Sequence, residues 1–153
     1  MPRLLIAAAA ASMAFTGLAT AQDAPFKMEI AARQGIMAYR AIQMGTLGGM
    51  AKGEIPYDAA AAQKAADNLL ASVTLDASML WPPGSDNAAN PDSTALAAIW
   101  AEGSTIGDKA KAMADAATAM QAAAGAGLDP LKAAMGPVGG ACGDCHKAFR
   151  VPD

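Results

Sequence analysis

The sequence contains few charged, aromatic, histidine and cysteine residues. Among its 153 residues it has one histidine and two cysteines, 5% are aromatic and 16% are charged. The 11 basic residues are scattered and the net charge is -3, which excludes the basic patch typical of nucleic-acid binding. No Ser-His-Asp set, carboxylate pair or phosphate-binding loop is visible, so the sequence does not predict an enzyme.

The composition favours helices throughout. Hydrophobic residues make up 54% of the chain, 10 residues are methionine and 42 are alanine, whereas β-branched residues are few. Alanine and methionine favour helices, so we predict an all-α fold. A core built from these two residue types has little bulk, which favours a large apolar cofactor that completes it.

The first 21 residues have the three parts of a secretory signal peptide. Arg3 supplies a positive charge, residues 4–18 are apolar, and Ala19-Thr20-Ala21 is a small-residue cleavage site. The apolar run is shorter than the roughly 18 residues that a membrane-spanning helix needs. We therefore predict cleavage after Ala21, export to the periplasm, and a single mature domain of residues 22–153.

Apolar spacing and chain breakers predict four helices. They cover, in chain order, residues 27–50, 59–74, about 92–124 and about 129–149. Asp58 is placed to cap the second helix, and Gly136-Pro137 is expected to kink or split the last one. Four such helices favour an antiparallel four-helix bundle.

The connections between the helices differ in length. Gly48, Gly49 and residues 52–56 are expected to end the first helix, and two proline-containing turns make residues 80–91 a long loop. The third helix is expected to start at Asp92 or Ser93, with Leu96, Ile99 and Trp100 on its apolar side. The fourth is expected to start with Asp129 as N-cap and Pro130 in the first turn.

Both cysteines and the only histidine lie in Cys142-Gly143-Asp144-Cys145-His146, the C-x-x-C-H pattern of c-type haem attachment. In such sites the two thiols bind the haem vinyl groups as thioethers, and the adjacent imidazole is an axial iron ligand. The cysteine spacing is close to one helical turn, so both sulfurs can reach one ring edge. We predict one haem c per chain, bound through Cys142 and Cys145, with His146 on the iron.

Three other interpretations of the cysteine pair are weaker. A thioredoxin-type redox pair would need a βαβ context, and this chain is predicted to be helical. A zinc site would need a fourth ligand. A disulfide between Cys142 and Cys145 is expected only as a passing state before haem attachment.

The motif lies near the C-terminus of a helical chain, and there the sequence resembles the class II cytochromes c, the cytochrome c-prime family. The likeness covers essentially the whole mature chain. The matching stretches are Arg33, residues 51–58, residues 98–102 and residues 131–150. The resemblance implies a four-helix bundle with haem attached to its last helix.

The second axial position of the iron is the main open question. Because His146 is the only histidine, that position holds a methionine, a weaker ligand or nothing. In the family, high-spin members leave it open to small gases, whereas low-spin members fill it with a methionine from the first helix. The resemblance places that methionine at Met37, with Met44 as the alternative, and residues 56–58 look more like the low-spin members. For any single methionine, core packing is the ordinary interpretation.

The resemblance also implies roles for two arginines. Arg33 matches an arginine near a haem propionate, and Arg150 matches a basic residue beside the axial imidazole. The alternatives are a solvated surface arginine for Arg33 and a cation favoured by the helix dipole for Arg150. Trp100 and Tyr57 are interpreted as packing residues, either of which could contact haem.

The leading functional prediction is a periplasmic electron carrier with a six-coordinate His/Met haem. The alternative is a five-coordinate, high-spin protein that binds nitric oxide or carbon monoxide. Expected partners are periplasmic or membrane-bound redox proteins. The family often forms homodimers through its first two helices, and Gly45, Gly48 and Gly49 would permit close approach.

Overall fold

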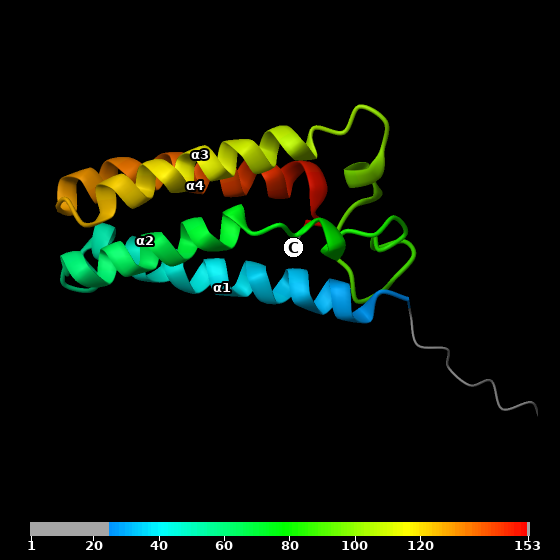
Figure 1. Cartoon of the computed structure of the whole chain (residues 1–153), viewed down its shortest axis with the longest axis horizontal. Coiled ribbons are helices and arrows are strands. Elements are labelled where there is room, and N and C mark those ends of the chain that lie inside the picture. The colour runs from blue at the N-terminus through cyan, green and yellow to red at the C-terminus, as the bar shows by residue number, and fades with distance from the viewer. Residues whose placement is uncertain (1–24, 153) are drawn as a thin grey trace, which may run out of the picture.

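A computed structural model describes residues 25–152 as four long helices that run alternately up and down, side by side (Figure 1). They are α1 (Lys27–Lys52), α2 (Ala59–Thr74), α3 (Ile106–Ala124) and α4 (Leu128–Phe149), with short 3-10 turns η1 (Ser78–Leu80) and η2 (Ala97–Trp100). The predicted all-α, antiparallel four-helix bundle is confirmed. The predicted signal peptide, residues 1–21, lies outside the described residues.

The first two helices are close to the prediction. α2 has the predicted bounds because the Asp58 side chain accepts a hydrogen bond from the Ala61 backbone N–H at 2.8 Å and so caps the helix. Of the residues expected to end the first helix, Gly53 does so, whereas Gly48 and Gly49 do not. Both are buried inside α1, which continues to Gly53, where a φ of 77° ends it in the left-handed region.

The predicted start of the third helix is wrong. α3 begins at Ile106, and Gly103 has a φ of 74°, which breaks any helix upstream of it. The segment before it bonds to the end of α4 instead: Leu96 N–H donates to the Phe149 carbonyl and Val151 N–H to the Thr94 carbonyl, each at 2.9 Å. These tertiary hydrogen bonds replace helical ones, so residues 93–105 belong to the long connection.

The last helix is continuous. Pro137 lies inside α4 without interrupting it, so of the two expected outcomes, a kink or a split, the split does not occur. The helix begins at Leu128 after Gly127, whose φ is 145°, and Asp129 lies in the first turn without capping it.

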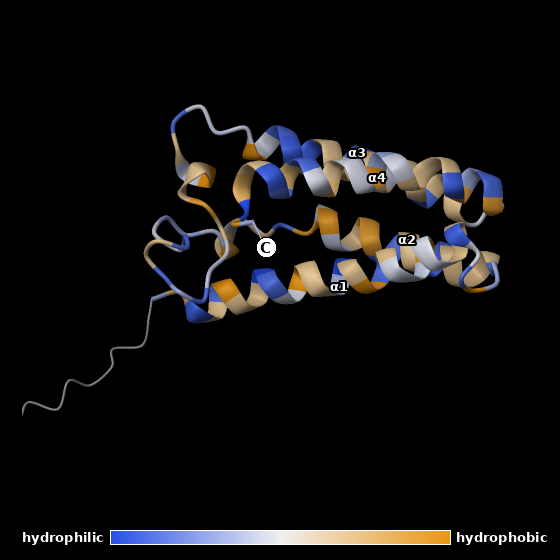
Figure 2. Cartoon of the chain, turned by 180° about the vertical axis from the view of Figure 1, so that it is seen from behind, coloured by the Kyte–Doolittle hydropathy of each residue, from blue (hydrophilic) through white to orange (hydrophobic). Residues whose placement is uncertain are grey.

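The buried side chains form two separate clusters. The main cluster fills the bundle between the four helices, and the end cluster lies where the long connection covers the end of the bundle. Ala95, Ile99 and Phe149 make up the end cluster, with Trp81, Trp100, Ile106 and Cys145 packed against it. Figure 2 shows hydrophobic residues both along the helices and in this connection. Within residues 25–152, no helix is long and apolar enough to cross a membrane.

Candidate haem-attachment site

The two cysteines of α4 lie at the boundary between the two clusters. Cys142 packs against the main cluster and Cys145 against the end cluster. Neither forms a disulfide, and both are half-buried. The Cys142 Sγ lies 3.8 Å from the Met113 Sδ on α3. His146, the next residue, is exposed.

Burial raises the pKa of both thiols above its ordinary value. The positive charge of Arg40 on α1 acts in the opposite direction on each of them. Lys109 on α3 also lowers the pKa of Cys145, so positive charges on two helices act on the attachment motif. The charge of Arg40 links the face of α1 that carries it to the attachment motif on α4.

Met37 lies on that same part of α1. Its side chain is 37% exposed and belongs to neither hydrophobic cluster. Arg40 Nη1 donates a long hydrogen bond of 3.8 Å to the Met37 Sδ. The other nitrogens of Arg40 bind α2, with Nε donating to the Ser72 hydroxyl at 3.2 Å and Nη2 to the Ser72 carbonyl. Met44, the alternative ligand, packs against the main cluster.

Arg33 is buried, with only 5% of its surface exposed, so the alternative of a solvated surface arginine is wrong. Its Nη1 donates to the Leu80 carbonyl at 3.3 Å and to the Ser85 hydroxyl at 2.7 Å. Its Nη2 donates to the Ser85 carbonyl and to the Ser93 hydroxyl at 2.7 Å. Burial lowers the pKa of the guanidinium. Arg33 thus holds the long connection onto α1, and contact with a propionate stays a prediction.

The remaining predicted residues divide between the two ends of the bundle. Arg150 follows α4 in extended backbone and pairs with Ala95 in an isolated β-bridge. Trp100 packs against the end cluster, and its indole N–H donates to the Trp81 carbonyl at 3.0 Å. The Tyr57 hydroxyl donates to the Ala124 carbonyl at 2.8 Å, far along the chain from the motif. The packing roles expected for Trp100 and Tyr57 are confirmed.

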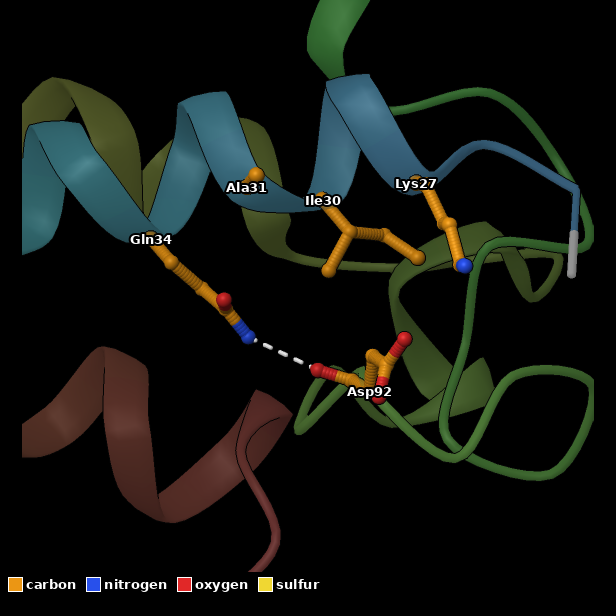
Figure 3. A pocket seen from close by; sticks show the side chains of 5 residues that line it. All are labelled: Lys27, Ile30, Ala31, Gln34 and Asp92. Atoms are coloured by element: carbon orange, nitrogen blue, oxygen red, sulfur yellow. Dashed lines mark hydrogen bonds between the residues drawn. The ribbon is translucent and has the colours of Figure 1, made fainter. Parts of the chain in front are cut away.

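A pocket of about 440 Å³ lies beside the start of α1. Figure 3 shows Gln34 pointing across it, where its amide donates to the Asp92 carbonyl at 2.8 Å. A second hollow lies between α3 and α4, lined mainly by alanine and glycine together with Asp115 and Asp144. Among the described residues, no group of three or more histidine, cysteine or acidic side chains could hold a bare metal ion. The prosthetic group that the attachment motif predicts for this site is haem c.

The residues present fit such a group. Two half-buried thiols sit where one hydrophobic cluster ends and the other begins, and apolar side chains flank both. α1 and α4, which carry Met37 and the motif, contact each other less extensively than the other neighbouring helix pairs. A flat apolar group bonded to the two sulfurs would join the clusters into one core.

Sequence reasoning missed Arg40 and Met113 as residues that interact with the motif, and Ser72 as the residue that binds Arg40. Arg40 comes three residues after Met37, so the helical period places both on one side of α1, and this signal was available. Nothing in the sequence indicates that Ser72 would hold the guanidinium, because the two residues are far apart in the chain.

The fold and site define a helical c-type cytochrome with haem attached near the C-terminus. The family model for cytochrome c' matches residues 28–150. A cytochrome c-554 from Cereibacter sphaeroides is 46% identical over 136 residues, covering 88% of this chain and 89% of the relative. The structure of cytochrome c' from Rhodobacter sphaeroides superposes with a TM-score of 0.81 at 41% identity, covering 84% of this chain and 98% of that one.

A more distant structure is the nitric oxide complex of a cytochrome c' variant from Alcaligenes xylosoxidans, with a TM-score of 0.73 and 29% identity, covering 86% of this chain and all of that one. The chain belongs to the cytochrome c' family. Its cofactor is covalently bound haem c, and Cys142 and Cys145 are the only cysteines that can carry it.

Proposed function

We propose that the protein carries single electrons, with His146 and Met37 as the axial ligands of its haem iron. The contact of Arg40 with the Met37 Sδ supports this assignment most directly. The positive charge of Arg40 lowers the pKa of both attachment thiols, and Arg40 contacts the Met37 thioether, which supports a place for Met37 beside the haem. Met44 is engaged in the main cluster, which argues against it as the ligand.

Haem bound at this site supplies an iron that takes up and releases one electron. The chain's own residues would keep the surroundings of the iron the same in both oxidation states. His146 lies on a continuous helix, and Met37 lies on another helix of the same bundle. Ligands on rigid helices move little when the charge changes, and unchanged ligation favours rapid electron transfer. A thioether ligand also stabilises the reduced state relative to a second imidazole.

Optical spectra of the holoprotein test the ligand assignment. The wild type is expected to be low-spin, with a sulfur-to-iron charge-transfer band in the oxidised state and little response to carbon monoxide in the reduced state. Met37→Ala is expected to become high-spin and to bind carbon monoxide readily. Met44→Ala is the matched control and should keep the wild-type spectrum. A low-spin spectrum in Met37→Ala would refute the assignment of Met37.

The second candidate function is binding of nitric oxide or carbon monoxide at an open distal position. The nitric oxide complex of the related Alcaligenes variant favours it. Under this alternative the wild type itself would be high-spin, and its reduced spectrum would shift when carbon monoxide is added. Met37 would then be distal packing, and Met37→Ala would change gas affinity without changing the spin state.

The periplasm is the proposed location, and redox proteins there or in the adjoining membrane are the proposed partners. The signal-peptide pattern of residues 1–21 supports this location, and the intact mass of the protein recovered from a periplasmic fraction tests the predicted cleavage after Ala21. A product that keeps residues 1–21 and stays in the cytoplasm would contradict it.

We further propose a homodimer through α1, as the family resemblance implies. Ile42 is 66% exposed and Tyr39 41% exposed on this helix, and Gly45 has open space around it. Gly48 and Gly49 are buried within the subunit and cannot contribute to such a contact. Sedimentation of Ile42→Glu should show monomers where the wild type shows dimers, and a monomeric wild type would contradict the proposal.

A further inference from the structure

Arg40 places a positive charge inside the bundle without an acidic partner. The residue is half-buried, and burial lowers its pKa, yet an arginine remains charged throughout the physiological range. Its hydrogen-bond partners are the neutral groups of Ser72 and Met37. Within residues 25–152 no carboxylate is seen in an ion pair with Arg40.

The charge lies on the side of the site where the haem is attached. The Arg40 Nη1 lies 3.8 Å from the Sδ of Met37, the proposed iron ligand on α1. The same positive charge lowers the pKa of both attachment thiols on α4, which supports this placement of the guanidinium. Ser72 fixes its position through two hydrogen bonds from α2.

We propose that Arg40 raises the reduction potential of the haem by holding a permanent, uncompensated positive charge beside it. The oxidised haem carries one more positive charge than the reduced haem. A nearby cation therefore disfavours the oxidised state, and a half-buried cation does so with little screening by salt. This role rests on the proposed site, in which Met37 lies beside the haem, and the spectra of Met37→Ala test that placement separately.

A mediated redox titration of the holoprotein, with dithionite and ferricyanide as electron donor and acceptor, tests the charge. Arg40→Met keeps the apolar stem and removes the charge. At a fixed ambient potential its ratio of reduced to oxidised haem is expected to fall about tenfold, which is 59 mV for a one-electron couple. Arg40→Lys keeps the charge and should stay within twofold of the wild type.

A second pair of variants, at Ser72, changes the net charge around the guanidinium while Arg40 itself remains. Ser72→Asp places a carboxylate beside the guanidinium and should lower the potential in the same direction as Arg40→Met. Ser72→Asn has a similar shape without the charge and should leave the potential near that of the wild type. Lys64→Met, which removes an exposed lysine of α2, controls for the general effect of losing a positive charge.

Three results would overturn the proposal: an unchanged potential in Arg40→Met, an equal fall in Arg40→Met and Arg40→Lys, or equal effects of Ser72→Asp and Ser72→Asn. The second would mean that Arg40 acts by tying α1 to α2 and not by its charge. If Arg40→Met fails to yield holoprotein, the Ser72 pair decides alone. All of these variants keep Met37. The potentials can therefore be interpreted even if the spectra show that Met37 does not bind the iron.

Discussion

The Arg33 guanidinium lies over the Trp81 ring, with its central carbon 4.6 Å from the ring centroid. This contact joins α1 to the connection that covers the end of the bundle. Trp81 packs in turn against the end cluster and against Trp100, whose ring centroid is 6.5 Å away. One buried cation therefore organises the loop that closes the site beside Cys145.

Replacing Arg33 should loosen this connection. Arg33→Met would leave the Ser85 and Leu80 carbonyls without their charged donor, and the free energy of unfolding is expected to fall by about 3 kcal/mol. Arg33→Lys keeps the charge but loses the fork of donors, so it should recover only part of that loss. Denaturant unfolding of the holoproteins measures both, and a change below about 0.5 kcal/mol in Arg33→Met would contradict the anchoring role.

The local features of this chain could be predicted, whereas its long-range contacts could not. The attachment motif is contiguous, and the N-cap at Asp58 lies next to its helix, so both were visible in the sequence. The partners of Arg33 are Leu80, Ser85 and Ser93, which lie between 47 and 60 residues away, and no local pattern connects them. Only the fold brings these polar groups to one buried cation.

The predicted start of the third helix was wrong for the same reason, namely contacts between residues far apart in the chain. Leu96, Ile99 and Trp100 have helical spacing and form a short 3-10 turn at most. Leu96 N–H donates to the Phe149 carbonyl, and the Thr94 carbonyl accepts from Val151 N–H. These bonds to the end of α4 stabilise another conformation. Tertiary contacts thus overrode a correct local periodicity.

Tyr57 offers a test of how the other end of the bundle is held. Its hydroxyl bonds to the last residue of α3, so Tyr57→Phe should lower the free energy of unfolding by about 1 kcal/mol. Tyr39→Phe, at an exposed position of α1, is the matched control and should change it by less than about 0.5 kcal/mol. Equal effects of the two substitutions in thermal or denaturant unfolding would count against the Tyr57 hydrogen bond.

The raised thiol pKa values predict a pH dependence for the haem-free chain. The folded state holds the protons of Cys142 and Cys145 more tightly than the unfolded state does, because burial raises the pKa of each thiol. The unfolded chain therefore loses protons first as the pH rises past about 8.5, and stability should fall above that pH. Below it the contribution is constant.

Denaturant unfolding between pH 7 and 10 measures this dependence. The holoprotein is expected to lack this pH dependence, because thioether sulfurs do not titrate. A haem-free chain with both cysteines replaced by serine is expected to lack it as well. The same slope in all three proteins would assign the effect to other groups.

Two glycines distinguish the observed start of α3 from the predicted one. Gly103 has a φ of 74°, in the left-handed region, whereas Gly107 lies within α3, and neither has a neighbour within 4 Å of an added Cβ. Gly103→Ala should therefore destabilise the protein by about 1 kcal/mol through backbone strain. Gly107→Ala should stabilise it by about 0.5–1 kcal/mol, because alanine favours the helix and loses less backbone entropy. Thermal unfolding of the two holoproteins measures both signs. If both substitutions were stabilising, residue 103 would be helical and α3 would begin before Ile106.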